Sequence, residues 1–101
     1  MPRGYWIVHI DVHDPEAYQK YVAANGAALT KFGARFLARG GKHVVTAGAA
    51  RARHVVVEFR DYATAIACHH SGDYREAAKL RDAASVADLV IVEGYDGPQP
   101  G

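Results

Sequence analysis

Hydrophobic and polar residues alternate along several short segments of the chain, as they do in half-buried β-strands. The alternation predicts strands at residues 4–12, 35–39, 54–60 and 89–94, and a further short strand at 43–46 after the Gly40-Gly41 turn. In the first strand Trp6, Val8 and Ile10 fall on one side, whereas His9 and Asp11 fall on the other. One side of this strand is therefore apolar and the other carries ionisable groups.

A first helix is predicted after this strand. Tyr18, Val22 and Leu29 recur at the spacing of one helix face. Asp14 suits the N-cap position, and Gly33 suits a left-handed residue that ends the helix.

The second helical segment contains an interruption. It begins at Tyr62, where Asp61 can cap it, and it breaks at residues 71–73. Asp73 can cap a second piece, which we expect to run over residues 74–84.

The resulting order β-α-β-β-α-β predicts an α+β, ferredoxin-like protomer, in which an antiparallel sheet of strand order 4-1-3-2 carries two helices on one face. A chain of 101 residues makes one domain. We expect this domain to span residues 1–95, followed by a flexible Pro/Gly tail at residues 96–101.

The two faces of the predicted sheet differ in character. The face expected under the helices comprises Trp6, Val8, Ile10, Val55, Val57, Phe59, Val90 and Val92. The opposite face is expected to hold His9, Asp11, Arg35 or Arg39, His54, Glu58, Arg60 and Glu93, among Ile7, Leu37, Val56, Leu89 and Ile91. That face is too apolar for water and too charged for a core, so we expect a second copy to cover it, forming a homodimer with a partly polar lumen.

Acid–base chemistry is the first candidate activity. We predict His9, Asp11 and Glu58 as catalytic residues, because they share one sheet face and a histidine beside a carboxylate suits proton transfer near neutral pH. The alternative is that opposed charges on neighbouring strands only stabilise the lumen.

A second set of residues is suited to ligand binding. The predicted ligand-binding residues are Arg39, His54, His69, Tyr74 and Arg81. Of these, Arg39 or Arg81 would position an anionic group. Arg81 can instead pair with a nearby acid, Asp82 or Asp88.

Three aromatic residues admit two interpretations. Trp6, Tyr18 and Tyr21 can form a wall for a flat substrate, although aromatic residues at helical spacing are more often part of the core.

Composition narrows the function classes. With 12 Lys+Arg against 11 Asp+Glu, the chain lacks the basic footprint of proteins that bind nucleic acid or an anionic membrane. No apolar run is long enough to span a bilayer, and a single cysteine forms no intrachain disulfide, so we expect a cytoplasmic protein.

No metal or cofactor is expected. The chain has six histidines, but no metal-ligand spacing motif is present. The adjacent His69 and His70 would point about 100° apart on a helix rather than toward one ion.

Several segments together resemble a known family. GYWIVHIDVHDPEAYQKYV, KFGARFLARGG, HVVVEF, SGDYREAAKLR and LVIVEG resemble, in order and spacing, the family called domain of unknown function 1330. The resemblance implies a member of the dimeric α+β barrel superfamily. The chain departs from the family at Cys68-His69-His70, where a run resembling Trp-Tyr-Asp is expected, so its ligand is expected to differ if this segment lines the site.

The superfamily includes cofactor-free monooxygenases, isomerases and cyclases, but none of their catalytic motifs matches this chain residue by residue. We therefore expect either a cofactor-independent enzyme performing acid–base chemistry on a small organic molecule, or a non-catalytic ligand-binding or accessory dimer. A purely structural dimerisation module, with a packed and dry lumen, is the third hypothesis.

Overall fold

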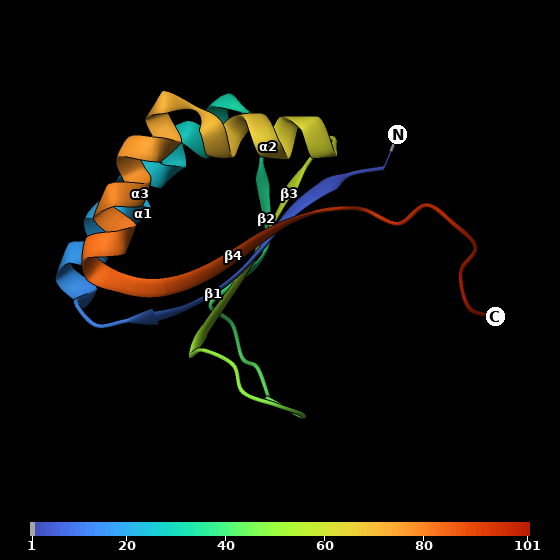
Figure 1. Ribbon diagram of the computed structural model, residues 1–101, viewed down its shortest axis with the longest axis horizontal. Helices are drawn as coiled ribbons and strands as arrows, with labels where there is room; N and C mark the ends of the chain where they lie inside the picture. Colours follow the sequence, from blue (N-terminus) through green and yellow to red (C-terminus); the bar gives the residue numbers. More distant parts are fainter. Residues whose placement is uncertain (1) are drawn as a thin grey trace.

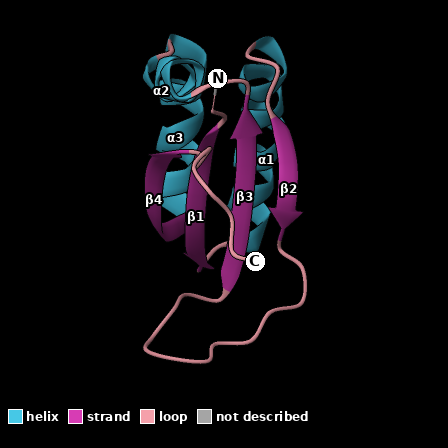
Figure 2. Cartoon of the chain, turned by 90° about the vertical axis from the view of Figure 1, so that its right-hand side faces the viewer, coloured by secondary structure: helices cyan, strands magenta, loops and turns pink. Residues whose placement is uncertain are grey.

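The computed structural model describes residues 2–101 and places all helices on one face of a four-stranded antiparallel sheet (Figures 1 and 2). The elements are β1 (Gly4–Val12), α1 (Pro15–Lys31), β2 (Arg35–Arg39), β3 (Arg53–Phe59), α2 (Tyr62–His70), α3 (Gly72–Ala84) and β4 (Ser85–Glu93). The strands lie in the order β2-β3-β1-β4, and every neighbouring pair is antiparallel. The predicted ferredoxin-like α+β fold is confirmed.

Helix α1 begins and ends at the predicted signals. The Asp14 side chain accepts a hydrogen bond from the backbone N–H of Ala17 at 3.1 Å, which satisfies one of the free donors of the first turn. Gly33 follows the helix with φ of 67°, in the left-handed region that glycine adopts without strain.

The interruption between α2 and α3 is centred on Ser71. Its hydroxyl donates to the Cys68 carbonyl at 2.7 Å and accepts from the backbone N–H of Tyr74 at 3.2 Å. Ser71 therefore ends α2 and caps α3, and the prediction that Asp73 caps the second piece was wrong. Asp61 caps α2 as expected, since it accepts from the backbone N–H of Thr64.

The core lies between the sheet and the helices, and Trp6 is its largest fully buried side chain. The indole packs against Phe59 and Tyr74, with ring centroids 5.0 and 4.7 Å away. Its Nε1–H donates to the Ala65 carbonyl at 3.0 Å, so the ring fills the core without leaving a buried donor unpaired.

Strand β4 differs from its prediction in both length and face. It starts at Ser85 rather than Leu89, and its register places Ile91 opposite Trp6 and Leu89 opposite Val8. Directly opposed residues share a face, so Leu89 and Ile91 pack under the helices. Val90 and Val92, which were predicted there, lie exposed on the side of the sheet that faces away from the helices, which we call the open face.

The same register corrects the position of an acid. Glu93 was predicted beside His9, but it lies opposite Gly4 at the far end of the pair. The residue opposite His9 is Asp88. Because side chains alternate along a strand, a shift of one residue in the pairing of β4 with β1 moves every β4 side chain to the opposite face.

Strand β2 is irregular, and the segment after it contains no strand. A bulge between Phe36 and Ala38 places Arg39 opposite Val55, on the helix side, whereas Arg35 lies opposite Glu58 on the open face. Residues 40–52 form an exposed loop that projects from the sheet (Figures 1 and 2), and the strand predicted at 43–46 is absent from it.

No helix within residues 2–101 combines the length and the apolar character needed to cross a membrane. Residues 94–101 follow β4 as an extended segment without helix or strand, leading away from the sheet (Figure 1).

Two glycines provide a matched stability test. A Cβ on Gly4 would lie 2.7 Å from the Tyr62 Cα, whereas a Cβ on Gly26, in the middle of α1, would meet nothing within 4 Å. We expect Gly4→Ala to destabilise the fold by about 1–3 kcal/mol through overpacking. Gly26→Ala should stabilise it by up to about 1 kcal/mol through helix propensity. Thermal unfolding followed by circular dichroism measures both, and a lower melting temperature for Gly26→Ala would contradict the assignment of an unobstructed helix position.

Candidate functional site

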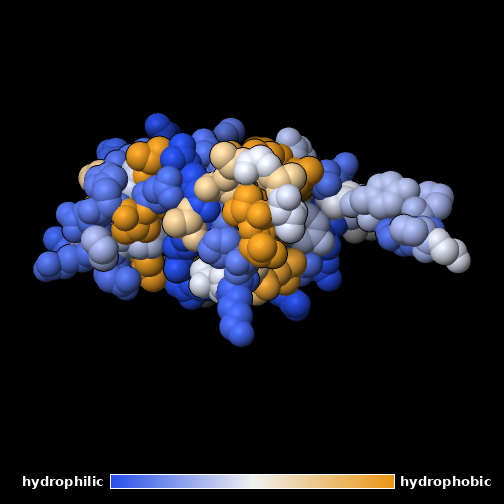
Figure 3. All heavy atoms as spheres, turned by 90° about the horizontal axis from the view of Figure 1, so that it is seen from below, coloured by the Kyte–Doolittle hydropathy of each residue, from blue (hydrophilic) through white to orange (hydrophobic). Residues whose placement is uncertain are grey.

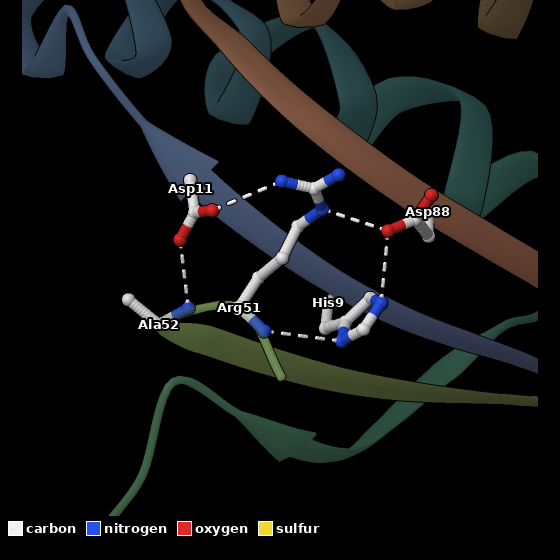
Figure 4. Close-up of polar contacts among 5 residues, drawn as sticks. All are labelled: His9, Asp11, Arg51, Ala52 and Asp88. Carbon is white, nitrogen blue, oxygen red and sulfur yellow. Dashed lines mark hydrogen bonds and ion pairs between the residues drawn. The ribbon is translucent and has the colours of Figure 1, made fainter. Parts of the chain in front are cut away.

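The open face of the sheet carries a network formed by His9, Asp11, Arg51, Ala52 and Asp88, which we call the His9 network (Figure 4). His9 Nε2 lies 2.9 Å from the carboxylate of Asp88 on the neighbouring strand. His9 Nδ1 accepts a hydrogen bond from the backbone N–H of Arg51 at 3.3 Å. The imidazole is therefore held from both sides.

Arg51 connects the two acids of the network. Its Nε donates to Asp88 at 2.7 Å and its guanidinium also donates to Asp11 at 3.0 Å. The other Asp11 oxygen accepts from the backbone N–H of Ala52 at 2.9 Å. The Ala52 and Arg51 hydrogen bonds lower the pKa of Asp11, and the Arg51 hydrogen bond lowers the pKa of Asp88, because both favour the charged carboxylate.

These contacts favour a structural role for His9. Because Nδ1 accepts from Arg51, the neutral imidazole carries its proton on Nε2 and donates it to Asp88. Both ring nitrogens are then in use, and neither is free to take a proton from a ligand. The network fastens the end of the 40–52 loop to β1 and β4.

Glu58 does not join the His9 network. It lies opposite Tyr5, four residues and about 13 Å along β1 from His9. Its carboxylate pairs with Arg35 at 3.3 Å and accepts from the Tyr5 hydroxyl at 3.4 Å. Of the three predicted catalytic residues, the structure thus brings His9 and Asp11 together and leaves Glu58 apart.

His54 lies beside the network on the open face. Its ring centroid is 6.0 Å from that of His9 and 4.5 Å from that of His43 in the loop. A depression of about 280 Å³ lies here, lined by Ile7, Val8, His9, His54, Val55, Val56, Asp88 and Val90. No group of three or more His, Cys, Asp or Glu side chains within residues 2–101 is arranged to hold a metal ion.

A second candidate site lies on the other side of the sheet, beneath α1. We call it the inner cavity, of about 30 Å³, lined by Trp6, Val8, Ile10, Tyr18, Tyr21, Val22, Asn25, Phe36, Arg39, Arg53, Val55 and Val57. This volume holds roughly two water molecules. The aromatic side chains of Trp6, Tyr18 and Tyr21 are buried in the core and also line the inner cavity, and their use as a wall for a flat substrate stays a prediction.

A larger hollow adjoins the inner cavity. We call it the outer depression, of about 360 Å³, lined by Val12, Pro15, Tyr18, Gln19, Val22 and Arg53. Tyr18, Val22 and Arg53 line both hollows, so the two hollows adjoin at these three side chains.

The wall of the inner cavity contains two unsatisfied polar atoms. Asn25 is only 8% exposed, and its Oδ1 accepts no hydrogen bond. The Nε of Arg53 is also buried and has no acceptor. Leaving a buried polar atom unpaired costs about 1–3 kcal/mol, so each atom favours a polar partner entering the cavity.

A chain of hydrogen bonds crosses the α1–α3 interface to the cavity. Arg81 donates to the Tyr74 hydroxyl at 2.8 Å, and the hydroxyls of Tyr74 and Tyr21 lie 2.9 Å apart. Tyr74 is fully buried, so its own proton is best satisfied by donation to Tyr21. The Tyr21 proton is then left free to be donated elsewhere.

Burial keeps the two tyrosines of this hydrogen-bonded chain protonated. Desolvation raises the pKa of Tyr21 and, to a smaller extent, that of Tyr74, because the phenolate would be charged in an apolar layer. Tyr21 therefore remains a protonated hydrogen-bond donor at neutral pH and does not act as a base.

His69 and Cys68 lie behind the cavity wall and do not line either hollow. The His69 ring packs edge-on against Trp6 and tilted against Tyr74, and burial together with nearby Arg81 lowers its pKa. Cys68 is fully buried, and desolvation raises the pKa of its thiol to about 12, which makes it a poor nucleophile.

The predicted ligand-binding residues thus separate into two groups. Arg39, Tyr74 and Arg81 belong to the inner cavity and its hydrogen-bonded chain, His69 packs behind it, and His54 lies on the open face. Sequence reasoning did not propose Arg51, Asp88, Arg53 or Asn25. Only Asn25 has a readable signal, because it is a polar residue at helical spacing between the buried Tyr21 and Leu29.

The fold and the site place the chain among small ferredoxin-like α+β proteins with a cavity between sheet and helices. The model of the family described as domain of unknown function (DUF1330) matches residues 3–95, and the chain belongs to this family. A search among proteins with curated descriptions gave no significant match.

Solved structures show the same fold. The RPA0582 protein of unknown function from Rhodopseudomonas palustris superposes with a TM-score of 0.74 at 18% identity, over 95% of this chain and 85% of that one. SnoaB, a cofactor-independent oxygenase from Streptomyces nogalater, has a TM-score of 0.64 at 12% identity, over 99% and 97%. An antibiotic biosynthesis monooxygenase has a TM-score of 0.55 at 17% identity, over 97% and 100%.

The His9 network predicts a pH dependence of stability. The pKa values of Asp11 and Asp88 are lower in the folded chain than their ordinary value of about 4, so both carboxylates stabilise the fold above that pH, and this stabilisation is lost as the pH falls from there through their lower folded-state pKa values. Arg51→Met should raise the pKa of Asp88 and reduce the loss of stability as the pH falls below about 4. Side-chain NMR titration and denaturant unfolding measure the two effects.

Arg75→Met is the matched control, because Arg75 is exposed on α3 and has no ion pair among the described residues. An Asp88 pKa that is the same in Arg51→Met and in the wild type would show that Arg51 does not hold the network together.

Proposed function

We propose that this chain is a cofactor-independent enzyme that stabilises an oxyanion of a small organic molecule in the inner cavity. The observation that supports it is the hydrogen-bonded chain from Arg81 through Tyr74 to Tyr21, a residue that lines the inner cavity. With Tyr74 donating to Tyr21, the Tyr21 proton is available to a substrate oxygen. A fixed donor in a dry site stabilises developing negative charge more strongly than water does.

The composition of the wall sets the type of chemistry. Among the described residues that line the inner cavity there are two arginines, two tyrosines and one asparagine, but no carboxylate and no histidine. The site therefore offers donors and positive charge, and no strong base. It suits a substrate whose own C–H or O–H is acidic enough to lose a proton to water once its oxyanion is stabilised.

Several reactions begin with such an oxyanion. Isomerisation and cyclisation of an enolisable compound pass through an enolate, with the proton returned to carbon or oxygen at the end. Oxygenation passes through an enolate or phenolate that is oxidised by dioxygen, with one oxygen atom entering the product and the other leaving as water. The fold shared with SnoaB, which is a cofactor-independent oxygenase, supports the proposal. The catalytic roles of His9 and Asp11 stay predictions. They are not part of this proposal, because both ring nitrogens of His9 already have partners.

The alternative is a protein that binds a ligand in the same cavity without turnover. The absence of a side-chain base from the described cavity wall favours this alternative. The two functions differ in whether Tyr21 affects a rate or only an affinity.

Tyr21→Phe separates the two functions. The change removes the donor at the cavity wall together with the acceptor of the Tyr74 proton, and we expect the loss of the donor to lower turnover by about 10²–10³-fold. The measurement uses a panel of small enolisable ketones and hydroxyarenes in D₂O, with deuterium incorporation followed by NMR and oxygen uptake by an electrode.

The matched control is Tyr5→Phe, because the Tyr5 hydroxyl contacts Glu58 on the open face instead. If the wild type turns over no compound, or if Tyr21→Phe keeps the wild-type rate, the enzyme proposal fails and the binding alternative is favoured.

We also propose that the open face of the sheet pairs with a second copy of the chain. Hydrophobic side chains gather on this side of the molecule among hydrophilic ones (Figure 3), and Ile7, Val90 and Val92 are each more than two-fifths exposed there. Monomeric proteins rarely leave an extended apolar patch in water. A self-complementary face with both acids and bases suits a two-fold dimer.

Val90→Glu tests the dimer. A charge in the middle of the apolar patch would be desolvated at the interface, so we expect the variant to be monomeric at micromolar concentration while the wild type is dimeric. Light scattering after size exclusion measures the mass. Leu80→Glu, at an exposed position of α3 on the opposite side, is the control and should leave the dimer intact. A monomeric wild type would overturn the proposed pairing.

A further inference from the structure

Two arginines at the inner cavity have no acidic partner. Within residues 2–101, Arg35, Arg51, Arg60 and Arg81 each lie within 4 Å of a carboxylate, whereas Arg39 and Arg53 do not, although both line the inner cavity. Two neighbouring cations without an acid make a wall of uncompensated positive charge.

The local backbone makes room for Arg53. Gly40 has φ of 66°, and a Cβ there would lie 2.8 Å from the Arg53 Cζ, so the guanidinium occupies space that only glycine leaves free. The same guanidinium lies 5.9 Å from the centroid of the Tyr18 ring. Arg53 is thus packed between the turn after β2 and α1, and its buried Nε still has no acceptor.

The β2 bulge brings the second arginine to the same wall. Without the bulge the alternation along β2 would place Arg39 on the open face with Arg35, but the bulge places it opposite Val55. Its guanidinium lies 4.2 Å from the centroid of the Phe36 ring, which holds the cation over an aromatic face.

We propose that the ligand of the inner cavity is a small planar carboxylate that carries a hydroxyl group, and this inference rests on the proposed function. The carboxylate binds Arg53 and Arg39, since arginine presents paired donors that match the two carboxylate oxygens. The body of the ligand occupies the outer depression beside Tyr18 and Val22. Its hydroxyl reaches into the inner cavity and donates to Asn25 Oδ1.

The dimensions of the two hollows support this class. The inner cavity, at about 30 Å³, accommodates a small polar group or roughly two waters but no ring, whereas the outer depression, at about 360 Å³, accommodates a ring. Among the residues that line the inner cavity, the unsatisfied atoms are one donor, Arg53 Nε, and one acceptor, Asn25 Oδ1. A ligand with an anionic oxygen and a hydroxyl satisfies both, and a fully apolar ligand satisfies neither.

The test compares two probes of nearly the same shape, 3-hydroxybenzoate, which carries a negative charge, and the neutral 3-hydroxybenzamide, in which an NH₂ donor replaces one carboxylate oxygen. Trp6 is the single tryptophan of the chain and lines the inner cavity, so its fluorescence reports binding, and calorimetry gives the affinity. We expect the wild type to bind the benzoate at least tenfold more tightly than the benzamide, with the difference decreasing at high salt.

Variants then show which arginine side chains bind the carboxylate. Arg53→Met and Arg39→Met should each weaken benzoate binding at least tenfold and leave benzamide binding unchanged. Gly40→Ala should act in the same direction, because its Cβ displaces the Arg53 guanidinium. Arg35→Met is the matched control, since Arg35 is on the same strand but pairs with Glu58 on the open face, and it should bind like the wild type.

Three results would overturn the proposal. The wild type could bind benzoate and benzamide with equal affinity, or it could bind inorganic phosphate more tightly than benzoate. The third result is a benzoate affinity that neither Arg53→Met nor Arg39→Met changes. The wild-type comparison decides even if a variant does not fold. If the benzamide binds as tightly as the benzoate and Tyr21→Phe still loses turnover, the ligand class is wrong and the proposed function stands. If the benzoate binds as expected but Tyr21→Phe has no effect on rate, the ligand class stands and the enzyme proposal fails.

Discussion

The register between β1 and β4 is the constraint on which the rest of the structure depends. Pairing Trp6 with Ile91 and His9 with Asp88 assigns every β4 side chain to a face. The helix side then receives Leu89 and Ile91, which complete the layer around the buried indole. The open side receives Asp88, the acid that holds His9 and Arg51. One set of backbone hydrogen bonds therefore determines both the core and the His9 network.

The His9 network and the inner cavity differ in how well their polar groups are satisfied. In the His9 network each charged group has a partner, and the network holds a loop in place, although the Nε2 of neighbouring His54 is buried without a partner. In the inner cavity the Arg53 Nε and Asn25 Oδ1 have none, although burial makes this costly. Buried polar groups retained without partners are expected where a ligand completes them, which is why the proposed function rests on the helix side.

Much of the fold could be predicted because its signals are local. Alternation defined β1, and Asp14 and Gly33 marked the ends of α1. The face of β4 could not be predicted, since Leu89, Val90, Ile91 and Val92 are all apolar and only pairing with β1 distinguishes them. Asp88 was missed because the predicted strand began at Leu89, one residue after it, whereas β4 begins at Ser85.

The side on which Arg39 lies depends on a bulge that leaves no mark in the sequence RFLAR. The structure brings Tyr74 and Arg81 together in one hydrogen-bonded chain, while their role in ligand binding stays a prediction, and Tyr21 entered the sequence prediction only as an aromatic wall.

The direct passage from α3 into β4 limits how the chain can change in length. Ala84 ends the helix and Ser85 begins the strand, and the Ala84 carbonyl accepts hydrogen bonds from the backbone N–H groups of both His13 and Asp14. A single inserted residue at this junction would either break these bonds or move β4 by one position and exchange its faces. Length variation among relatives should therefore be confined to the exposed 40–52 loop and the end of the chain, where an added residue alters no strand pairing.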